Sequence, residues 1–319
     1  MTPSIVVVGA GPAGLAAATE AATAGAAVTL FDEQEEPGGQ LRYRIQPVTV
    51  AAGSHADRPD RIAERLVDAA LAAGVAFHTN ATVAGCFAGL ELLVIEDGVS
   101  SREAPDCLIV TTGSTDLPYP FSGATYPGVF SARGLQILLN LHRVRPGRRF
   151  AIIGGAADAE ELAVDVMLAG GEVGWSGIAP APFLSADGSE GVRGLTVGQD
   201  HYAVDVIAIA VGRQADPALA TMVGTPLAFS TELGGLIPLV DNQLRSPIAG
   251  LFVAGDAAGV GSVAAAIAEG RLAGIAAAAS LGLASDEDVT AVRAAGGPEL
   301  AWRLATRTAL PAVSAQPYQ

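Results

Sequence analysis

Short apolar runs and helical spacing of apolar residues alternate along the first part of the chain. Residues 4–8 and 27–32 are short, almost uninterrupted apolar runs, which is typical of buried strands in a parallel sheet. Between them, residues 12–25 predict an alanine-rich helix that ends near Gly25. A strand, a helix and a second strand in this order predict a βαβ unit at the start of the chain.

Similar patterns continue up to residue 128. Residues 34–60 are expected to be irregular, and residues 58–74 predict an amphipathic helix. The segment 114–128 contains three prolines and two glycines, which is typical of a crossover to a second domain. Strands are expected at 75–78, 81–88, 90–96, 99–103 and 107–111, with a hairpin turn at Asp97-Gly98.

The middle of the chain predicts a second domain. A helix over 131–143 is followed by a strand at 150–153, which opens another βαβ unit. A later strand is expected over 204–211, and residues 235–240 lead back towards the first domain. The tail is expected to form one short helix at about 287–306.

The bulk composition excludes several classes of function. The 319 residues carry a formal net charge of −15, which disfavours binding to nucleic acid phosphates. The chain contains no lysine, so Schiff-base chemistry through a lysine amine is excluded. The four histidines lack the spacing of metal ligands, and no metal site is expected.

Cysteine use and hydropathy bear on redox chemistry and location. Cys86 and Cys107 form no Cys-x-x-Cys motif, so neither a redox-active disulfide nor an iron–sulfur cluster is expected, and both are interpreted as buried, inert thiols. The most apolar stretch, Val263–Ala284, is interrupted by Glu269 and Arg271, so no membrane span is expected. Because a strand begins at residue 4, a signal peptide is not expected. A cytoplasmic location is therefore expected.

A glycine-rich turn joins the first strand to the first helix. Gly9, Gly11 and Gly14 form a Gly-x-Gly-x-x-Gly pattern in the strand–turn–helix context that predicts a dinucleotide site. Gly9 permits the tight turn, Gly11 lets a pyrophosphate approach the backbone, and Gly14 allows close helix–strand packing. Pro12 and Ala13 complete the turn, and the helix N-terminus offers N–H donors to an anion. A glycine-rich turn of another α/β protein is the alternative.

Two further elements support a nucleotide site. Asp32 ends the second strand and is positioned to accept hydrogen bonds from a ribose diol, with Glu33 as the reserve candidate. Near the other end of the chain, residues 250–254 lead into Gly255-Asp256 and a second alanine-rich helix that begins at Ser262. We therefore predict that the first and last parts of the chain form one nucleotide-binding domain.

Three motifs together resemble the two-domain flavoprotein disulfide-reductase superfamily. They are Glu36-Pro37-Gly38-Gly39-Gln40-Leu41, Thr111-Thr112-Gly113 and Gly255-Asp256. The resemblance implies an α/β fold of glutathione/thioredoxin-reductase type, with two Rossmann-like three-layer domains, the second inserted in the first. It implies an FAD-binding domain over residues 1–114 and 245–319, and an NAD(P)-binding-like, degenerate domain over residues 115–244.

The same resemblance implies roles for residues of the FAD site. Asp256 would bind the ribityl chain and phosphate side of FAD, with a simple helix-preceding cap as the alternative. The helix that begins at Ser262 and Val263 would point its N-terminus at the flavin pyrimidine ring. The backbone of Val83 would contact adenine. The remaining cofactor candidates are Gly39, Gln40, Arg42, Thr112, Gly113 and Gly255. For Arg42 and Arg44, the alternatives to the FAD phosphates are an acidic partner or a solvated position in the loop.

The second βαβ unit has a weaker fingerprint. Its turn reads Gly154-Gly155-Ala156-Ala157-Asp158-Ala159, and a Cβ at Ala156 would crowd a pyrophosphate. The next strand, over 173–176, carries neither an acid for a ribose diol nor arginines for a 2′-phosphate. The sequence therefore argues against an intact NAD(P) site, and leaves a vestigial fold or another nucleotide as alternatives. The acids Asp158, Glu160 and Glu161 are interpreted as helix caps.

Finer motifs resemble one branch of the superfamily, over nearly the whole chain to about Leu283. This branch comprises the FAD-containing α subunits of heteromeric amine and amino-acid dehydrogenases: hydroxyproline and proline dehydrogenases, opine oxidases, hydrogen cyanide synthase and sarcosine oxidase. Many of these α subunits continue into a cysteine-rich domain with an iron–sulfur cluster. Because this chain has two cysteines, either a small [2Fe–2S] subunit supplies the cluster or none is needed. The motifs are Pro37–Gln40 with Tyr43-Arg44, Thr112–Pro118, Tyr126–Val129, Gly255–Gly259 and Glu269–Gly274.

Three functional hypotheses follow. The first is an FAD-dependent oxidoreductase subunit that passes electrons within a multi-subunit amine or amino-acid dehydrogenase of proline, hydroxyproline, opine or sarcosine type. Its partner would be a catalytic flavoprotein resembling D-amino-acid or sarcosine oxidases, since no catalytic acid/base set is identified in this chain. The second is a free-standing NAD(P)H-dependent flavoprotein reductase of ferredoxin-reductase type. The third is a scaffold without enzymatic activity.

Overall fold

The computed structural model describes residues 2–50, 54–155, 157–188 and 190–313, and the chain forms two compact units. Unit 1 consists of Met1–Arg42, Pro47–Ser114 and Gln214–Gln319, and unit 2 of Tyr43–Gln46 and Thr115–Arg213. The chain thus returns to unit 1 at Gln214, whereas the sequence analysis placed this return at residue 245. Strands β17 (Leu227–Ser230) and β18 (Gly235–Pro238) account for the difference, because their buried residues pack in a small core of unit 1.

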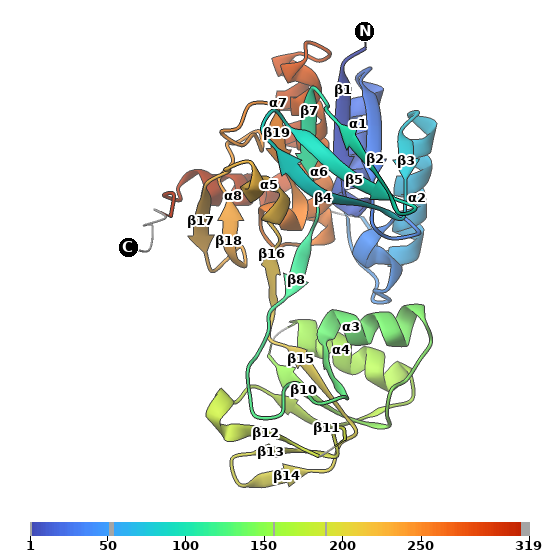
Figure 1. Ribbon diagram of the computed structural model, residues 1–319, viewed down its shortest axis with the longest axis vertical. Helices are drawn as coiled ribbons and strands as arrows, with labels where there is room; N and C mark the ends of the chain where they lie inside the picture. The colour runs from blue at the N-terminus through green and yellow to red at the C-terminus, as the bar shows by residue number, and fades with distance from the viewer. Residues whose placement is uncertain (1, 51–53, 156, 189, 314–319) are drawn as a thin grey trace. The chain divides into compact units, whose positions relative to one another are not determined.

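A five-stranded parallel sheet forms the centre of unit 1 (Figure 1). Its strand order is β19-β7-β1-β2-β3, so β19, near residue 252, pairs with β7, which lies more than 140 residues earlier in the chain. The apolar runs that form β1, β7 and β19 are buried on both faces of the sheet, whereas β3 is only partly buried. The bounds are β1 Ser4–Val8, β2 Ala27–Phe31, β3 Ala76–His78, β7 Cys107–Val110 and β19 Leu251–Val253.

Two further layers complete unit 1. Helices α1 (Pro12–Thr23) and α6 (Val263–Ser280) cover one face of the sheet. The antiparallel sheet of β4 (Ala81–Phe87), β5 (Glu91–Glu96) and β6 (Val99–Glu103) lies over the other face (Figure 1). One continuous core joins the three layers. The other elements are η1 Gly39–Arg42, α2 Pro59–Ala72, α5 Ala218–Met222, η4 Gly255–Ala258, α7 Asp286–Ala295 and α8 Gly297–Thr308.

The tail contains two helices, so the prediction of one helix over 287–306 is wrong. Helix α7 begins with a capping box between Ser285 and Asp288. The helix cannot continue through Gly297, whose φ is +76°, and Pro298, which lacks an N–H. Helix α8 is therefore a separate helix, and it buries Leu300, Arg303, Leu304 and Arg307.

Unit 2 repeats the three-layer plan with a four-stranded parallel sheet, in the order β11-β10-β15-β9. Alternate residues of β10 point to opposite faces: Phe150 and Ile152 pack under α3 and α4, and Ala151 and Ile153 face the antiparallel sheet β12-β13-β14. The predicted helix over 131–143 is α3 followed by a π-helical turn, η2. The bounds are β9 Val129–Ser131, α3 Ala132–Gln136, η2 Ile137–Leu141, β10 Arg149–Gly154, α4 Ala157–Leu168, β11 Glu172–Gly177, η3 Ala181–Phe183, β12 Leu184–Asp187, β13 Gly194–Val197, β14 Asp200–Tyr202 and β15 Val206–Ala210; at the crossings, β8 Ser114–Asp116 pairs with β16 Arg213–Ala215.

The segment Tyr43–Gln46 belongs to unit 2 although it follows η1 of unit 1 in the sequence. Arg44 donates from Nε and Nη2 to both carboxylate oxygens of Glu161, at 3.0 and 2.6 Å. Asn140 donates to the carbonyl oxygen of Tyr43 at 2.9 Å. The chain therefore passes between the two units at four places, and the second unit is not a single continuous insertion.

Helix α6 passes a length and hydropathy test for a membrane span. Its 18-residue window has a mean hydropathy of 1.3, and 67% of this window is buried within the protein. A buried core helix of a soluble protein gives the same result, and the window contains Glu269 and Arg271. The finding is therefore weak support for a membrane segment.

Helices α1 and α6 touch backbone to backbone. An added Cβ at Gly270 would lie 2.1 Å from the carbonyl oxygen of Ala13, and one at Gly274 would lie 2.3 Å from that of Ala17. Real Cβ atoms do not approach backbone this closely, so only glycine fits at both positions. This contact fixes the distance between α1, which follows the glycine-rich turn, and α6, which follows Gly255-Asp256.

We expect Gly274→Ala to destabilise the protein by about 1–3 kcal/mol, because the added methyl group forces the two helices apart. Urea unfolding of the purified variant measures this change. The matched control is Gly155→Ala, whose Cβ would meet no atom within 4 Å and which should change the free energy of unfolding by less than about 0.5 kcal/mol. Equal stability of the two variants would contradict the assigned contact.

Candidate functional site

The three glycines of the fingerprint turn after β1 have different surroundings. Gly9 has φ +103°, and an added Cβ would lie 2.4 Å from the carbonyl oxygen of Thr111. A Cβ at Gly14 would lie 1.7 Å from the carbonyl oxygen of Gly9. At Gly11 the same Cβ would meet nothing within 4 Å. Packing of the chain therefore requires glycine at the first and third positions, whereas the second borders open space.

Helix α1 begins at this open space. Its N-cap, Gly11, makes no side-chain capping bond, and Pro12 at the first helical position has no N–H. The backbone N–H groups of Ala13 and Gly14 are therefore the first donors of the helix. A helix start of this kind is suited to an anionic group.

Asp32 contacts the turn directly. One carboxylate oxygen accepts a hydrogen bond from the N–H of Ala10, and the other accepts one from the N–H of Gln34 at 2.8 Å. Burial raises the pKa of the Asp32 carboxyl group, and these two backbone bonds oppose the rise. Glu33, the reserve candidate, is exposed to solvent. The structure thus places Asp32 at the open end of β2, where it also supports the glycine turn.

Asp256 brings three distant segments of the chain together. Its Oδ2 accepts hydrogen bonds from Nε2 of Gln40 in η1 at 3.0 Å and from the hydroxyl group of Ser114 at 2.9 Å. Its Oδ1 accepts the N–H of Gly261 at 3.1 Å. Gln40 and Asp256 were both predicted as site residues, and Ser114, which directly follows the predicted Thr112-Gly113, was missed. The carboxylate of Asp256 also holds its own loop through Gly261, which precedes Ser262, the N-cap residue of α6.

The start of α6 is capped by Ser262, and Ser262 is held in turn by α8. The side chain of Ser262 accepts the N–H of Ala265 at 3.1 Å, and its hydroxyl group donates to Glu299 of α8 at 2.7 Å. Val263 is buried in a small core beside Leu41. Helix α8 thus contacts the predicted flavin-facing end of α6.

The remaining predicted residues lie in the turns around Gly11 and Asp256 or in nearby strands. Gly113 has φ +85° and open space beside it, and the hydroxyl group of Thr112 donates to the carbonyl oxygen of Asp216 at 3.0 Å. Arg42 forms an ion pair with Glu36. An added Cβ at Gly39 would lie 2.8 Å from Cα of Gly11, and one at Gly255 would lie 2.6 Å from Cβ of Ala13. Val83 lies at a register shift between β4 and β5.

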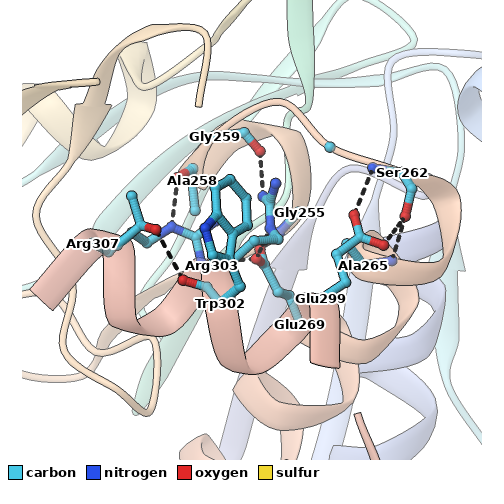
Figure 2. A network of polar contacts seen from close by, with 12 residues as sticks. Gly255, Ala258, Gly259, Ser262, Ala265, Glu269, Glu299, Trp302, Arg303 and Arg307 are labelled. Carbon is cyan, nitrogen blue, oxygen red and sulfur yellow. Dashed lines mark hydrogen bonds and ion pairs between the residues drawn. The ribbon is translucent and has the colours of Figure 1, made fainter. Parts of the chain in front are cut away.

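A group of buried ion pairs links α6 and α8 next to the loop of residues 255–262 (Figure 2). The sequence did not predict it. Glu269 is fully buried and pairs with Arg303 and Arg307, whose side chains are 2% and 1% exposed. Burial alone would raise the pKa of Glu269, but the charges of Arg307 and Arg303 outweigh it and hold the pKa below its ordinary value. The sequence signal was the spacing of four between Arg303 and Arg307, which places both on one helix face.

The second glycine-rich turn, in unit 2, offers a phosphate different surroundings from those of the turn in unit 1. An added Cβ at Gly154 would lie 2.1 Å from the carbonyl oxygen of Ala210, much like Gly9 in unit 1. Helix α4 has Asp158 and Glu160 in its first turn, where a phosphate would approach the N–H groups, and Asp158 pairs with Arg213 at 3.6 Å. Ala156 lies outside the described residues. Glu161, interpreted as a cap, instead pairs with Arg44.

Both cysteines are free and buried. Burial raises the pKa of the Cys86 thiol to about 11 and also raises that of Cys107. Neither is therefore a thiolate at neutral pH. Among the described residues, no group of His, Cys, Asp and Glu side chains is arranged to hold a metal ion.

Comparison with known proteins confirms the predicted fold class and the predicted resemblance. One subunit of the opine oxidase of Rhizobium meliloti (strain 1021) is 29% identical over 335 residues, which cover 88% of this chain and 72% of that protein. L-proline dehydrogenase from P. horikoshii superposes with a TM-score of 0.77 at 22% identity, over 100% of this chain and 61% of that chain. Thioredoxin reductase of T. acidophilum superposes with a TM-score of 0.68 at 19% identity, over 86% of this chain and 97% of that chain.

These similarities define the fold and the class of protein. The two solved structures share the fold, and the chain spans less than two thirds of the proline dehydrogenase chain. Residues 3–176 match the family described as pyridine nucleotide-disulphide oxidoreductase, and they make up more than half of the 319 residues. The predicted oxidoreductase class is thereby confirmed. The chain belongs to the pyridine nucleotide-disulphide oxidoreductase family.

Proposed function

We propose that the chain is the FAD-binding subunit of a multi-subunit oxidoreductase that oxidises a C–N bond of an amine or amino acid. The observation that carries this proposal is the contact of Asp256 with Gln40 and Ser114. Segments predicted separately to bind FAD meet at one carboxylate in a single compact unit. Chance packing of unrelated loops would not be expected to join these motifs.

The residues of unit 1 fit FAD. The open space beside Gly11 and the uncapped start of α1 suit a pyrophosphate, and Asp32 at the end of β2 suits a ribose diol. Asp256 would hold the ribityl and phosphate side, and the start of α6 at Val263 would face the flavin. When bound, FAD supplies the acceptance and release of electrons, and the chain supplies binding and orientation. The remaining proposed contacts are Gly9, Pro12, Ala13, Gly14, Glu33, Gly39, Gln40, Arg42, Val83, Thr112, Gly113, Gly255 and Ser262.

The relatives favour a role within a larger enzyme. The opine oxidase relative is a named subunit, and the proline dehydrogenase acts on an amino acid. Buried thiols with raised pKa values do not favour disulfide exchange in this chain. We infer that a catalytic flavoprotein partner resembling D-amino-acid or sarcosine oxidases binds the substrate, in the cytoplasm. A small [2Fe–2S] subunit is the proposed relay if electrons pass through a cluster.

A second candidate is a free-standing NAD(P)H-dependent flavoprotein reductase of ferredoxin-reductase type. The family description and the parallel sheet of unit 2 favour it. Asp158 and Glu160 in the first turn of α4 oppose it, because acidic side chains there disfavour a phosphate, although Arg213, 3.6 Å from Asp158, offsets part of that charge. We therefore place it second.

Replacement of Asp256 by alanine should weaken FAD binding at least about tenfold, because the acceptor shared by Gln40, Ser114 and Gly261 is lost. Titration of apo-protein with FAD, followed by flavin fluorescence, measures the dissociation constant. Asp286→Ala, an exposed acid in the first turn of α7, is the control and should bind FAD as wild type does. Full FAD occupancy of the Asp256 variant would refute its role.

The fingerprint glycines should separate cofactor binding from folding. Gly11→Ala has space for its methyl group, so its Tm without cofactor should match wild type while FAD binding weakens at least about tenfold. Gly14→Ala has no such space and should lower the Tm of the apo-protein. Thermal unfolding and FAD titration of both variants give the comparison. Unchanged FAD affinity in a folded Gly11 variant would argue against a pyrophosphate at this turn.

The isolated, FAD-loaded chain should not be reduced rapidly by NADH, NADPH or L-proline under anaerobic conditions. Helix α4 disfavours the nicotinamide nucleotides, and the amino acid is proposed to bind the catalytic partner. Flavin absorbance in a stopped-flow experiment is the readout, with dithionite as the positive control. Rapid bleaching by NADH or NADPH would favour the second candidate, and bleaching by proline alone would remove the need for a partner.

A further inference from the structure

One face of α8 carries three charged residues at a spacing of four. Glu299, Arg303 and Arg307 therefore lie in a row along the helix. All three contact the loop of residues 255–262, and the two arginines also pair with Glu269 of α6 (Figure 2). We refer to Glu269, Glu299, Arg303 and Arg307 as the loop-supporting group.

The two arginines donate to consecutive carbonyl groups of the loop. Arg303 donates from Nη1 to Val260 at 2.9 Å and from Nη2 to Gly259. Arg307 donates from Nε to Ala258 at 2.9 Å. As α8 advances, its contacts therefore move backwards along the loop. The loop is supported along its length, and not at a single point.

Glu269 and Glu299 hold the two ends of the loop. Glu269 accepts the N–H of Gly255 at 2.9 Å with one oxygen and pairs with Arg307 at 2.8 Å through the other. Glu299 accepts from the hydroxyl group of Ser262 at 2.7 Å, where the loop enters α6. Asp256 lies between these ends.

The arginines shape the loop as well as binding it. An added Cβ at Gly261 would lie 2.3 Å from Nη1 of Arg303, so the guanidinium group occupies the space of a side chain there. The N–H of Gly261 donates to Asp256. The position of Arg303 thus determines the path of the residue that orients Asp256.

Stability alone does not account for this group. Taking three charges out of water is costly, and buried ion triads in proteins are often replaced by apolar residues without loss of stability. The backbone partners of the two arginines all lie in the 255–262 loop. The group therefore has the arrangement expected of residues that hold the loop in one conformation before the cofactor binds.

We propose that the loop-supporting group consists of positioning residues that pre-form the 255–262 loop for the cofactor; this rests on the proposed FAD function. Asp256 and the start of α6 are then ordered in the apo-protein, and FAD does not have to order them on binding. Without the group, the free energy of ordering the loop is subtracted from the affinity for FAD.

The main test is the triple variant E269M/R303M/R307M, which removes the buried charges together and leaves no unpaired ion. We expect its apo-protein still to unfold cooperatively, at a Tm below that of wild type because the backbone groups of Gly255, Ala258, Gly259 and Val260 lose their hydrogen-bond partners. Its amides over residues 255–262 should exchange with deuterium at least about tenfold faster, and its FAD dissociation constant should rise at least about tenfold. The control R102M removes an exposed ion pair of the same unit and should change neither quantity.

A second variant tests the loop if the triple variant fails to fold. Glu299→Ala removes only an exposed carboxylate, so it should fold, and its loop amides near Ser262 should exchange at least about threefold faster with a parallel loss of FAD affinity. Wild-type exchange and FAD affinity in either folded variant would overturn the proposal. Exchange in the apo-protein does not depend on FAD, so a wild-type chain that binds no FAD would refute the proposed function separately.

Discussion

The direct contact between α1 and α6 is the constraint on which the arrangement of the candidate site depends. Gly270 and Gly274 bring the two helix backbones together with no side chain between them. Each helix follows one of the two predicted cofactor motifs, so the helices cannot shift independently without moving the motifs. A site assembled from the two ends of a chain needs such a fixed distance, and two glycines one helical turn apart supply it.

The shared plan of the two units makes their differences informative. Both have a parallel sheet with helices on one face and an antiparallel sheet on the other. In unit 1 the helix after the first strand starts with a glycine and a proline, and a Cβ added at that glycine would meet open space. In unit 2 the corresponding helix starts among acidic side chains. The fold is therefore compatible with a nucleotide in both units, whereas the local chemistry favours an anion only in the first.

The sequence predicted the parts of the site that depend on local chemistry. The glycine turn and Asp32 were named because each lies in a recognisable turn or at the end of a strand, whereas Gln40 and Asp256 were named because their motifs resemble those of a flavoprotein superfamily. The loop-supporting group could not be named, because it depends on the direction of α8. An uninterrupted helix over 287–306 would give Arg303 a different face from the one that the break at Gly297 produces. The hairpin β17–β18 was assigned to the wrong unit because strand periodicity does not say which core a strand packs against.

The segment Tyr43–Gln46 has a consequence for how this architecture can change during evolution. Because Arg44 pairs with Glu161, unit 2 is completed by residues that lie within the sequence of unit 1. Exchange of residues 115–213 for the corresponding part of another protein would leave Arg44 without its carboxylate unless the donor retained it. The two segments of unit 2 are thus constrained to diverge together, and a recombination event at residues 115 and 213 alone would separate two residues that form an ion pair.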